Sequence, residues 1–592
     1  MLQLRYVFGV NGEVALSRVG IDKVVYAVGA VLVVFDEITN TQTVLRGHTS
    51  LVTCLATNYG RVPEDQTLIV SGQRDPKGVS KPFALVWKLL RTNKPPQPVA
   101  RLEGPEKCVT GVAVISEERI IVAGGDEQNT IFVYKNFQLV QSLVTGRSTI
   151  SYLKFGERNL AIGSIDKIKV FDVDSNTVGK GLVIKSANAL YTESHGLILD
   201  TTGKVLSFQQ KLPLTQFPKT QALCWEEFGK RVVGITSDRH IYTAVLDDNG
   251  NWNIGNFIYI KYTTEKVRSI ISGRIVLTRD HILGKISDHG EVKIFQVSPF
   301  KEAWGLAIHP TISLAVTGDF SGKLQFFDLA NLRPISDRVV NCGNKVFCTC
   351  FSPDGKFLAV GQDEGWLTVL KVDDFKEVVQ RKLGNERITE IKFSPDGSNL
   401  VVGCWDQMLY VLRGGNFKLA GVLKGHSSSP VSLQFSENTK FIISDSKDGQ
   451  TLCWRLSNGE RVTKGISDLR CEPDGWTGLL DSRVSAIWDD TRYGDRSDIN
   501  TVAQNGNFLV TGDDFGSVNL FPFFCPRGTD HLDQQHNVHF AAVTRVLFAP
   551  TRLLLSLGGM DHALCVWELS DKVQEKPPPL LHPKIKRSWD GN

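Results

Sequence analysis

A short repeating unit governs what this 592-residue chain can fold into. Its clearest copy, Val346–Val372, reads as three short strands separated by two polar turns, Ser352–Gly355 (SPDG) and Gln362–Gly365 (QDEG). Proline presets φ for a turn, aspartate bonds back to the backbone, and glycine accepts a positive φ. Each strand is too short to be stable alone, so neighbouring copies of the unit must cover its apolar face.

Further copies of the unit occur along nearly the whole chain. The best preserved span Trp304–Leu329, Ile388–Arg413, Val431–Leu456 and Val543–Leu569. Each has small residues before the second turn, and an aromatic residue followed by a polar one closes the third strand in most of them. This pattern is typical of WD40 propeller blades. We therefore predict an all-β fold built from WD40 β-propellers.

The length of the chain sets the number of blades. At about 40–45 residues per blade the chain holds roughly thirteen or fourteen, whereas single propellers usually close at four to eight. We predict tandem propellers of about thirteen blades in two rings. The expected segments are 1–46 (an opening motif and the first blade strands, packed between or against the rings), 47–298 (first propeller), 299–570 (second propeller, with an irregular blade at 457–521) and 571–592 (a proline-rich basic tail).

Composition and charge exclude several classes of protein. A net charge of +4 is too small for the basic field of a dedicated nucleic-acid binder, so we expect no nucleic-acid partner. The eleven cysteines lack paired spacing, which favours reduced, buried thiols and a reducing compartment. The sequence shows no signal peptide and no apolar stretch long enough to span a bilayer. We expect a soluble, cytoplasmic protein without a membrane partner.

The opening of the chain carries a family resemblance. Leu2–Gly12 (LQLRYVFGVNG) followed by Lys23–Asp36 (KVVYAVGAVLVVFD) resembles the hydrophobic (HELP-type) motif that opens the propeller region of echinoderm microtubule-associated protein-like (EML) proteins. Ala303–His309 resembles the start of that family's second propeller. The segments 486–500 and 511–521 are similar to its irregular late blade and the blade that follows.

The resemblance runs from about Leu2 to about Leu569. It implies tandem propellers of about thirteen blades, association with tubulin or microtubules, and an opening motif between the rings that includes Leu4, Tyr6, Phe8 and Gly9. The family's Tyr-Gly-Tyr-Arg-Gly is here FGVNG, at residues 8–12, so the motif is only partly kept. The sequence also starts at this motif, without the basic region and coiled coil of many members. We therefore expect no trimerisation by that route.

No pattern in the sequence indicates catalysis, a nucleotide site or a cofactor. There is no phosphate-binding loop and no nucleophile elbow. Paired carboxylates occur at Asp489-Asp490 and Asp513-Asp514, where turn formation is the favoured interpretation. The groups that could suggest a metal site are Cys342, Cys348 and Cys350, and His531, His536 and His539, but neither has the spacing of a known metal site. We expect no enzymatic activity, no cofactor and no bound metal.

Two segments are candidates for binding a partner. The irregular region contains Trp476, Trp488, Arg492 and Arg496 outside any regular blade, and the tail contains Lys584, Lys586 and Arg587. Aromatic and arginine side chains often anchor interfaces. The alternatives are that the tryptophans fill the gap left by an incomplete blade, and that the tail is a solvated end.

These observations predict a non-enzymatic interaction protein of the microtubule cytoskeleton, with tubulin and other cytoskeletal or axonemal proteins as partners. The ciliary axoneme is one possible location. The alternative function is a WD40 adaptor that presents substrates to a larger complex such as a ubiquitin ligase. The opening motif favours the first function, because generic adaptors lack it.

Overall fold

The chain forms two compact units in the computed structural model. One comprises Val10–Gln296, and the other comprises Met1–Gly9 together with Val297–Gln574. The structure describes residues 1–74, 81–89, 96–146, 150–155, 159–164, 167–172, 175, 177–179, 182–183, 190–191, 197–199, 204–207, 213–216, 222–228, 231–236, 240–246, 252–259, 267–271, 275–278, 281–287, 289–298, 302–463, 478–480, 482–488, 499–536 and 538–569.

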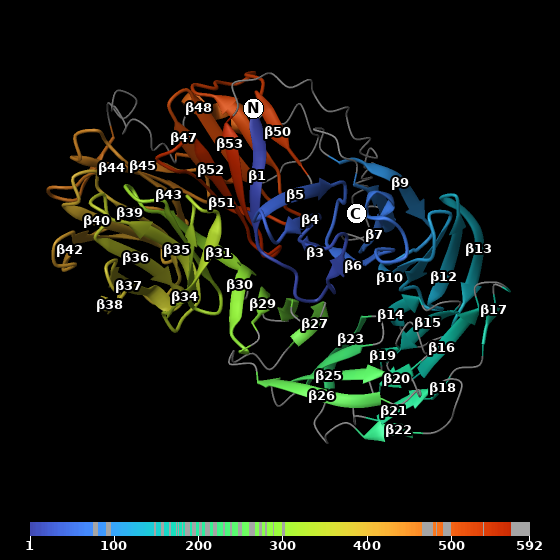
Figure 1. Ribbon diagram of the computed structural model, residues 1–592. Coiled ribbons are helices and arrows are strands. Elements are labelled where there is room, and N and C mark those ends of the chain that lie inside the picture. The colour runs from blue at the N-terminus through green and yellow to red at the C-terminus, as the bar shows by residue number, and fades with distance from the viewer. Residues whose placement is uncertain are drawn as a thin grey trace. The chain divides into compact units, whose positions relative to one another are not determined.

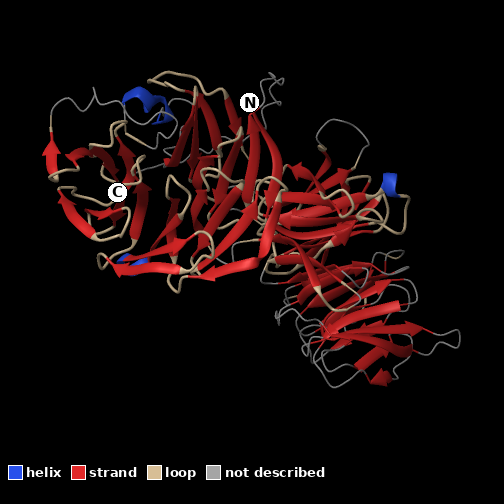
Figure 2. Cartoon of the chain, turned by 60° about the vertical axis from the view of Figure 1, so that its left-hand side comes forward, coloured by secondary structure: helices blue, strands red, loops and turns tan. Residues whose placement is uncertain are grey.

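Strands make up nearly all of the regular structure (Figure 2). The described residues form thirteen antiparallel sheets, twelve of four strands and one of five. Helical structure among them is limited to 3-10 turns at Glu64–Gln66, Asp363–Gly365 and Ser482–Trp488 (η4). The prediction of an all-β fold of tandem WD40 propellers with about thirteen blades is confirmed.

Seven of the sheets formed by the described residues belong to Val10–Gln296, which we call the first propeller. Its strands are β2 (Ser17–Arg18), β3 (Lys23–Val28), β4 (Val31–Asp36), β5 (Thr41–Arg46), β6 (Val52–Thr57), β7 (Leu68–Gln73), β8 (Phe83–Lys88), β9 (Pro98–Glu103), β10 (Val109–Val114), β11 (Arg119–Gly124), β12 (Thr130–Lys135), β13 (Gln138–Val144), β14 (Ile150–Phe155), β15 (Asn159–Ser164), β16 (Lys167–Asp172), β17 (Thr177–Val178), β18 (Leu182–Val183), β19 (Leu190–Tyr191), β20 (Leu197–Leu199), β21 (Lys204–Ser207), β22 (Pro213–Gln216), β23 (Ala222–Phe228), β24 (Arg231–Thr236), β25 (His240–Leu246), β26 (Trp252–Tyr259), β27 (Val267–Ile271), β28 (Ile275–Thr278), β29 (Ile282–Ile286) and β30 (Val292–Val297).

The other six sheets of the described residues form the second propeller. Its strands are β31 (Ala303–Ile308), β32 (Leu314–Asp319), β33 (Lys323–Asp328), β34 (Arg333–Asn341), β35 (Val346–Phe351), β36 (Phe357–Gln362), β37 (Trp366–Lys371), β38 (Glu377–Lys382), β39 (Ile388–Phe393), β40 (Asn399–Cys404), β41 (Met408–Arg413), β42 (Leu419–Lys424), β43 (Pro430–Phe435), β44 (Phe441–Ser446), β45 (Thr451–Arg455), β46 (Glu460–Val462), β47 (Ile499–Asn505), β48 (Phe508–Asp513), β49 (Val518–Pro522), β50 (Asp533–Gln535), β51 (Val543–Phe548), β52 (Leu553–Gly558), β53 (Leu564–Leu569) and β1 (Leu2–Phe8).

The start of the chain completes the last blade of the second propeller. β1 pairs antiparallel with β53, with Leu2 opposite Leu569, and Figure 1 shows the blue β1 arrow among the red strands of this blade. Tyr6 and Phe8 are buried. The aromatic ring of Phe8 lies 4.8 Å from that of Phe327 in the first blade of the second propeller. β1 thereby joins the last blade to the first. The expectation that residues 2–12 lie between the two rings concerns how the rings are placed, and it stays a prediction.

The first propeller joins its first and last blades through side chains. The ring of Phe35 in β4 lies 5.4 Å from the ring of Phe295 in β30. Lys285 Nζ in β29 lies 2.9 Å from the carboxylate of Glu37, which follows β4. Among the described residues, every strand of this propeller comes from its own continuous segment of chain.

A bulge near the start of the innermost strand links neighbouring blades. The register of the first two strands shifts after the first residue of that strand in both propellers, for example in β6, β39 and β51. The bulged residue is a threonine in these three strands. Thr53 Oγ1 donates to the Val109 carbonyl at 2.6 Å, and Thr544 Oγ1 donates to the Ala303 carbonyl at 2.8 Å. Each bond joins one blade to the next around its ring.

The blade of β51–β53 has the complete hydrogen-bonded chain of a standard WD40 blade. His539 Nε2 lies 2.8 Å from Ser556 Oγ, which also accepts the indole N–H of Trp567 at 2.8 Å. The other ring nitrogen of His539 lies 2.6 Å from the Asp561 carboxylate. All four side chains are buried. This network ties the turn before β53 to the strands on either side.

The blade of β6–β9 has the same network with one exchange. His48 Nε2 lies 2.7 Å from Ser71 Oγ, which accepts the indole N–H of Trp87 at 3.0 Å. Gln73 takes the place of the aspartate, with its Oε1 3.0 Å from His48 Nδ1. Because no carboxylate offsets burial, the pKa of His48 is lowered to about 4.

Candidate partner-binding surface

The connections within each blade fall at two opposite ends of its strands, because neighbouring strands run antiparallel. At one end lie the turn between the second and third strands and the link to the next blade, and we call this end the link face. In the second propeller its turns are 320–322, 363–365, 405–407, 447–450, 514–517 and 559–563.

Large apolar side chains are exposed on the link face of the second propeller. Trp405, Phe515 and Met560 lie in the turns of the third, fifth and sixth blades and are 36%, 59% and 61% exposed. Trp488, in the link between the fourth and fifth blades, is 38% exposed. Apolar groups that recur on one exposed face are typical of interaction surfaces.

A row of cations and aromatic rings crosses four neighbouring blades of this face. We call it the cation–aromatic band, and its members are, in order, Lys345, Phe320, Phe347, Arg387, Trp405 and Lys447. The Phe320 ring lies 5.5 Å from Lys345 Nζ and 4.8 Å from the Phe347 ring. The guanidinium carbon of Arg387 lies 5.1 Å from the centre of the Phe347 ring and 3.9 Å from that of Trp405. Lys447 Nζ lies 5.6 Å from the Trp405 ring. At such distances each cation attracts the ring face beneath it.

The backbone places the members of the band side by side. The N–H of the first turn residue donates to a carbonyl of the link that leads into the same blade. Trp405 bonds in this way to Arg387 at 2.9 Å, and Lys447 bonds to Ser429 at 3.0 Å. A residue in the turn and a residue in the link are thus held next to each other at the surface.

Most of the positive charge of the band is not neutralised within the described part of the chain. Among the described residues, Arg387 and Lys447 form no ion pair, and Lys345 lies 3.8 Å from Asp363 in an exposed pair. Nearby carboxylates are occupied within their own turns. Asp406, for example, accepts the hydroxyl of Tyr410 at 2.6 Å and a backbone N–H at 3.1 Å.

The irregular segment lies between the fourth and fifth blades of the second propeller. Leu479 N–H donates to the Asp445 carboxylate at the end of β44 at 2.8 Å. The Trp488 indole N–H, at the end of η4, donates to the Leu479 carbonyl at 2.7 Å. Val484 packs with Val502 of β47 in one apolar cluster. Trp488 is therefore anchored from within while part of its ring remains exposed.

The structure locates only some of the residues predicted from the sequence. In the opening motif, Tyr6 and Phe8 are buried, Leu4 is half-buried, and Gly9 has a φ of 130°, which favours glycine. The other predicted binding residues lie outside the described residues: Trp476, Arg492, Arg496, Lys584, Lys586 and Arg587. Their role stays a prediction.

The three clustered histidines have separate surroundings. His539 belongs to the network of its blade, and His536 Nδ1 lies 2.9 Å from Ser517 Oγ. The His531 ring packs edge-on against Phe521. No group of three His, Cys, Asp or Glu side chains within the described ranges is arranged to hold a metal ion.

Of the cysteines considered as ligands, Cys342 and Cys348 are buried in the second propeller and Cys350 is partly buried. Burial raises the pKa of the Cys342 thiol to about 12 and that of the Cys350 thiol to about 11, and it raises the pKa of Cys348 well above its usual value. A thiol must lose its proton to become a nucleophile or a metal ligand. These thiols therefore stay protonated near neutral pH.

The paired carboxylate Asp513 supports a turn. It accepts the backbone N–H groups of Phe515 and Ser517 at 3.0 and 2.8 Å, and burial raises its pKa. Asp489 and Asp490 lie outside the described residues. No helix in the described part of the chain combines the length and the apolar character that crossing a membrane requires.

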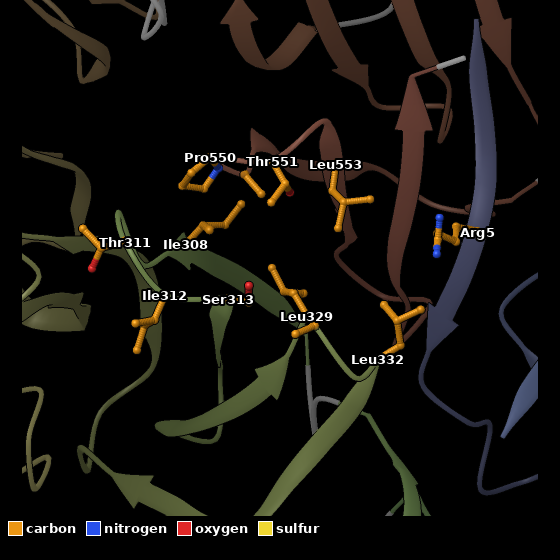
Figure 3. A pocket seen from close by; sticks show the side chains of 12 residues that line it. Arg5, Ile308, Thr311, Ile312, Ser313, Leu329, Leu332, Pro550, Thr551 and Leu553 are labelled. Atoms are coloured by element: carbon orange, nitrogen blue, oxygen red, sulfur yellow. The ribbon is translucent and has the colours of Figure 1, made fainter. Parts of the chain in front are cut away.

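The opposite face of the second propeller carries a hollow of about 390 Å³ at the seam between its last and first blades. Figure 3 shows Ile308, Leu329, Leu332 and Leu553 around it, with Arg5 of β1 at its edge. Arg5 already pairs with Glu568 at 2.7 Å. The hollow is thus mainly apolar and its one cation is engaged.

Residues 303–569 match the family model of the echinoderm microtubule-associated protein second beta-propeller. The matched segment contains every strand of the second propeller except β1. It also contains the whole cation–aromatic band and the other exposed side chains of the link face.

Curated relatives carry related names. "Echinoderm microtubule-associated protein-like 1" of Mus musculus is 27% identical over 363 residues, covering 59% of this chain and 43% of that protein. The "77 kDa echinoderm microtubule-associated protein" of Strongylocentrotus purpuratus is 29% identical over 363 residues, covering 59% and 51%. "Echinoderm microtubule-associated protein-like 4" of Mus musculus is 24% identical over 630 residues, covering 97% and 62%. The chain thus spans between 43% and 62% of the length of these relatives.

Proposed function

We propose that this chain, an EML-like WD40 protein, is a non-enzymatic microtubule-associated protein that binds tubulin or the microtubule wall. The names of its relatives describe microtubule-associated proteins, and the family match covers nearly all of the second propeller. The observation that carries the proposal is the link face of that propeller, where exposed aromatic side chains occur together with Arg387 and Lys447, which form no ion pair with any described residue. Binding through such a face needs no catalytic group.

The contact is local rather than a matter of general charge. With a net charge of +4, long-range attraction to an acidic surface is modest. The Debye length is about 8 Å at physiological ionic strength, so only charges close to the contact count. Aromatic and arginine anchors then supply most of the affinity. We propose Trp405, Phe515 and Trp488 as anchors, joined by Trp476, Arg492 and Arg496 of the irregular region.

Co-sedimentation with taxol-stabilised microtubules tests the proposal, together with gel filtration against free tubulin dimer. The full chain is compared with the double variant Trp405→Ala/Phe515→Ser and with a chain that ends at Asp571. Loss of binding in the double variant assigns the contact to the link face. Loss on truncation assigns it to Lys584, Lys586 and Arg587.

If neither tubulin nor microtubules bind at micromolar protein, the cytoskeletal function fails and the adaptor function takes its place. Affinity capture of a ubiquitin-ligase complex by the same chain would then be the expected finding. Under the proposed function, a fluorescently tagged chain should lie on the cytoplasmic cytoskeleton, and its distribution would show whether the axoneme is included.

A further inference from the structure

We infer that the cation–aromatic band is a receptor for an acidic peptide segment, in which a carboxylate of the peptide pairs with Arg387. The inference deepens the proposed function, on which it rests for the location of the contact, by naming the chemistry of the partner. The band suits such a partner because Arg387, its central cation, is half-buried against aromatic rings and has no counter-ion in the described part of the chain.

The guanidinium of Arg387 is held in place by two aromatic rings. Its carbon lies 3.9 Å from the centre of the Trp405 ring and 5.1 Å from that of Phe347. The ring faces restrict the planar group, so less side-chain freedom is lost when it forms hydrogen bonds. A carboxylate matches such a group with two parallel hydrogen bonds. Arg387 is therefore a preorganised carboxylate site rather than a freely moving surface charge.

A second arginine that stacks on an aromatic ring already has a carboxylate partner within the protein. In the first propeller the guanidinium carbon of Arg101 also lies 3.9 Å from an aromatic ring, that of Phe83. Its Nε, however, lies 2.9 Å from the Glu103 carboxylate. The two arginines share the stacking distance and differ in the carboxylate partner. Arg101 thus provides a matched control for Arg387.

The other cations of the band favour an extended segment over a single anion. Lys345 and Lys447 lie at the two ends of the band, beyond Phe320 and Trp405 respectively. The band crosses four blades, so a chain lying along it would meet one cation after another. Between the cations, the partly exposed rings of Phe320 and Trp405 can contact the aliphatic parts of the same peptide.

A peptide suits this face better than a nucleic acid. Glu364 and Glu386 are exposed on the same face, next to the band. A phosphate backbone carries a charge at every nucleotide and would place some of these charges against the two glutamates. A peptide can leave uncharged residues at those points. The exposed Phe515 and Met560 also offer apolar contacts that a peptide can use.

Fluorescence anisotropy with labelled peptides tests the inference on the full chain. The probes are a glutamate-rich peptide with interspersed leucines and a lysine-rich peptide of the same length. We expect the acidic probe alone to bind, with an affinity that falls as salt is raised. Arg387→Ala and Trp405→Ala should each weaken binding by about tenfold, because they remove a central anchor and its support. Arg101→Ala should leave the affinity unchanged.

Two further variants separate charge from stacking and from folding. Arg387→Lys keeps the charge but loses the planar group, so it should bind with an intermediate affinity. Glu386→Gln removes a repelling charge and should strengthen binding. Unaltered melting curves establish that these surface variants remain folded. Equal weakening by Arg387→Ala and Arg101→Ala would overturn the inference, and so would an acidic probe that does not bind at micromolar protein.

An outcome with another polyanion is equally decisive. If a single-stranded oligonucleotide of matched charge binds as tightly as the acidic peptide, the band is a general polyanion surface and the peptide assignment is wrong. The anisotropy assay contains no tubulin, so it stands apart from the proposed function. Peptide binding with no microtubule binding would keep the inference and reject the cytoskeletal partner. Microtubule binding that is insensitive to Arg387→Ala would keep the cytoskeletal partner and reject the inference.

Discussion

The two propellers close their rings by different physical means. In the second propeller a strand from the start of the chain, β1, adds a backbone ladder to β53 and buries Phe8 against the first blade. In the first propeller the described contacts between the first and last blades are made by side chains, such as Phe35 with Phe295. The first nine residues therefore belong energetically to the C-terminal part of the chain, although the first propeller follows them directly.

The link faces of the two propellers differ as well. In the first propeller, the described turn 125–129 of this face presents Asp126, Glu127 and Gln128. The exposed apolar residues among its described turns, Ile21, Ile38 and Phe137, lie at the opposite end of the strands. In the second propeller three exposed aromatic residues, Trp405, Trp488 and Phe515, lie on the link face, and Phe524 lies at the opposite end. The propeller that is closed by β1 is thus also the one whose link face carries exposed aromatic side chains.

Deleting residues 1–8 tests the closure of the second propeller and has the largest expected effect. The deletion removes the β1 ladder and the burial of Tyr6, Val7 and Phe8, which contributes about 1.5–3 kcal/mol per side chain. Hydrogen exchange followed by mass spectrometry should show faster exchange across β51–β53 and unchanged exchange across β6–β8. Adding a peptide of residues 1–8 in trans should restore protection. Unchanged exchange across β51–β53 would refute the role of β1 in closing the ring.

Single substitutions at the two seams sharpen the comparison. Phe8 and Phe35 are both fully buried, so Phe8→Ala and Phe35→Ala should each cost about 3–5 kcal/mol. The effects should be confined to different propellers, which hydrogen exchange can resolve. Because Phe8 lies on a terminal strand that is held by its pairing with β53, Phe8→Ala should also increase proteolysis near the N-terminus. A loss of protection in both propellers from either substitution would contradict separate closure.

The strands of the blades could be predicted because their signals are local. The turns SPDG and QDEG and the apolar residues beside them predict Val346–Phe351 and Trp366–Val372, and the structure has β35 at Val346–Phe351 and β37 at Trp366–Lys371. The pairing of β1 with β53 joins residues more than 550 positions apart, such as Leu2 and Leu569. No local pattern records such a pairing.

The cation–aromatic band was missed for a related reason. Trp405 and Phe320 lie in turns of the repeats, where an aromatic residue by itself indicates only that the segment belongs to a blade. Their contacts with Arg387 and Lys345 depend on how neighbouring blades pack. An alignment of the repeats within the chain would have shown aromatic residues where other turns are polar. The sequence did single out Trp488, because that residue interrupts the repeats.

The two histidine networks should make the propellers respond oppositely to acid. The pKa of His48 is about 4 in the folded chain, below the usual value near 6.5. Its stabilising contribution is therefore present above pH 6.5 and is lost as the pH falls toward 4, by about 3 kcal/mol in total. For His539, burial opposes protonation, but Cys565 and Asp561 more than offset it and raise the pKa. Its contribution is present below pH 6.5 and is lost only as the pH rises through the raised value.

Hydrogen exchange at a series of pH values measures this contrast. We expect protection of β6–β8 to fall between pH 6.5 and 4, and His48→Gln to remove most of that dependence. Burial also lowers the pKa of His426 in the second propeller, so His426 destabilises that propeller at low pH as His48 does the first. His539→Gln removes a stabilising contribution that is present at low pH, so it should leave β51–β53 more sensitive to acid. A pH profile of β6–β8 that is identical in the His48→Gln variant would refute the assignment.

The smallest expected effect comes from the threonines at the bulges, whose hydroxyl groups join one blade to the next. Thr544 Oγ1 donates to the Ala303 carbonyl at 2.8 Å across the seam where the second ring closes, and Thr389 Oγ1 donates to the Pro430 carbonyl at 2.7 Å between two consecutive blades. Replacing either threonine by valine removes the hydroxyl donor, so the carbonyl of the next blade loses a hydrogen bond. This loss should cost about 1 kcal/mol at each position.

Because β1 reinforces the seam, we expect Thr544→Val to be no more destabilising than Thr389→Val in a urea titration of the full chain. Combining Thr544→Val with the deletion of residues 1–8 should then cost more than the sum of the two changes, because the hydroxyl and the strand hold the same seam. Simple additivity would mean that β1 stabilises only its own blade and that the ring is closed by its innermost strands alone.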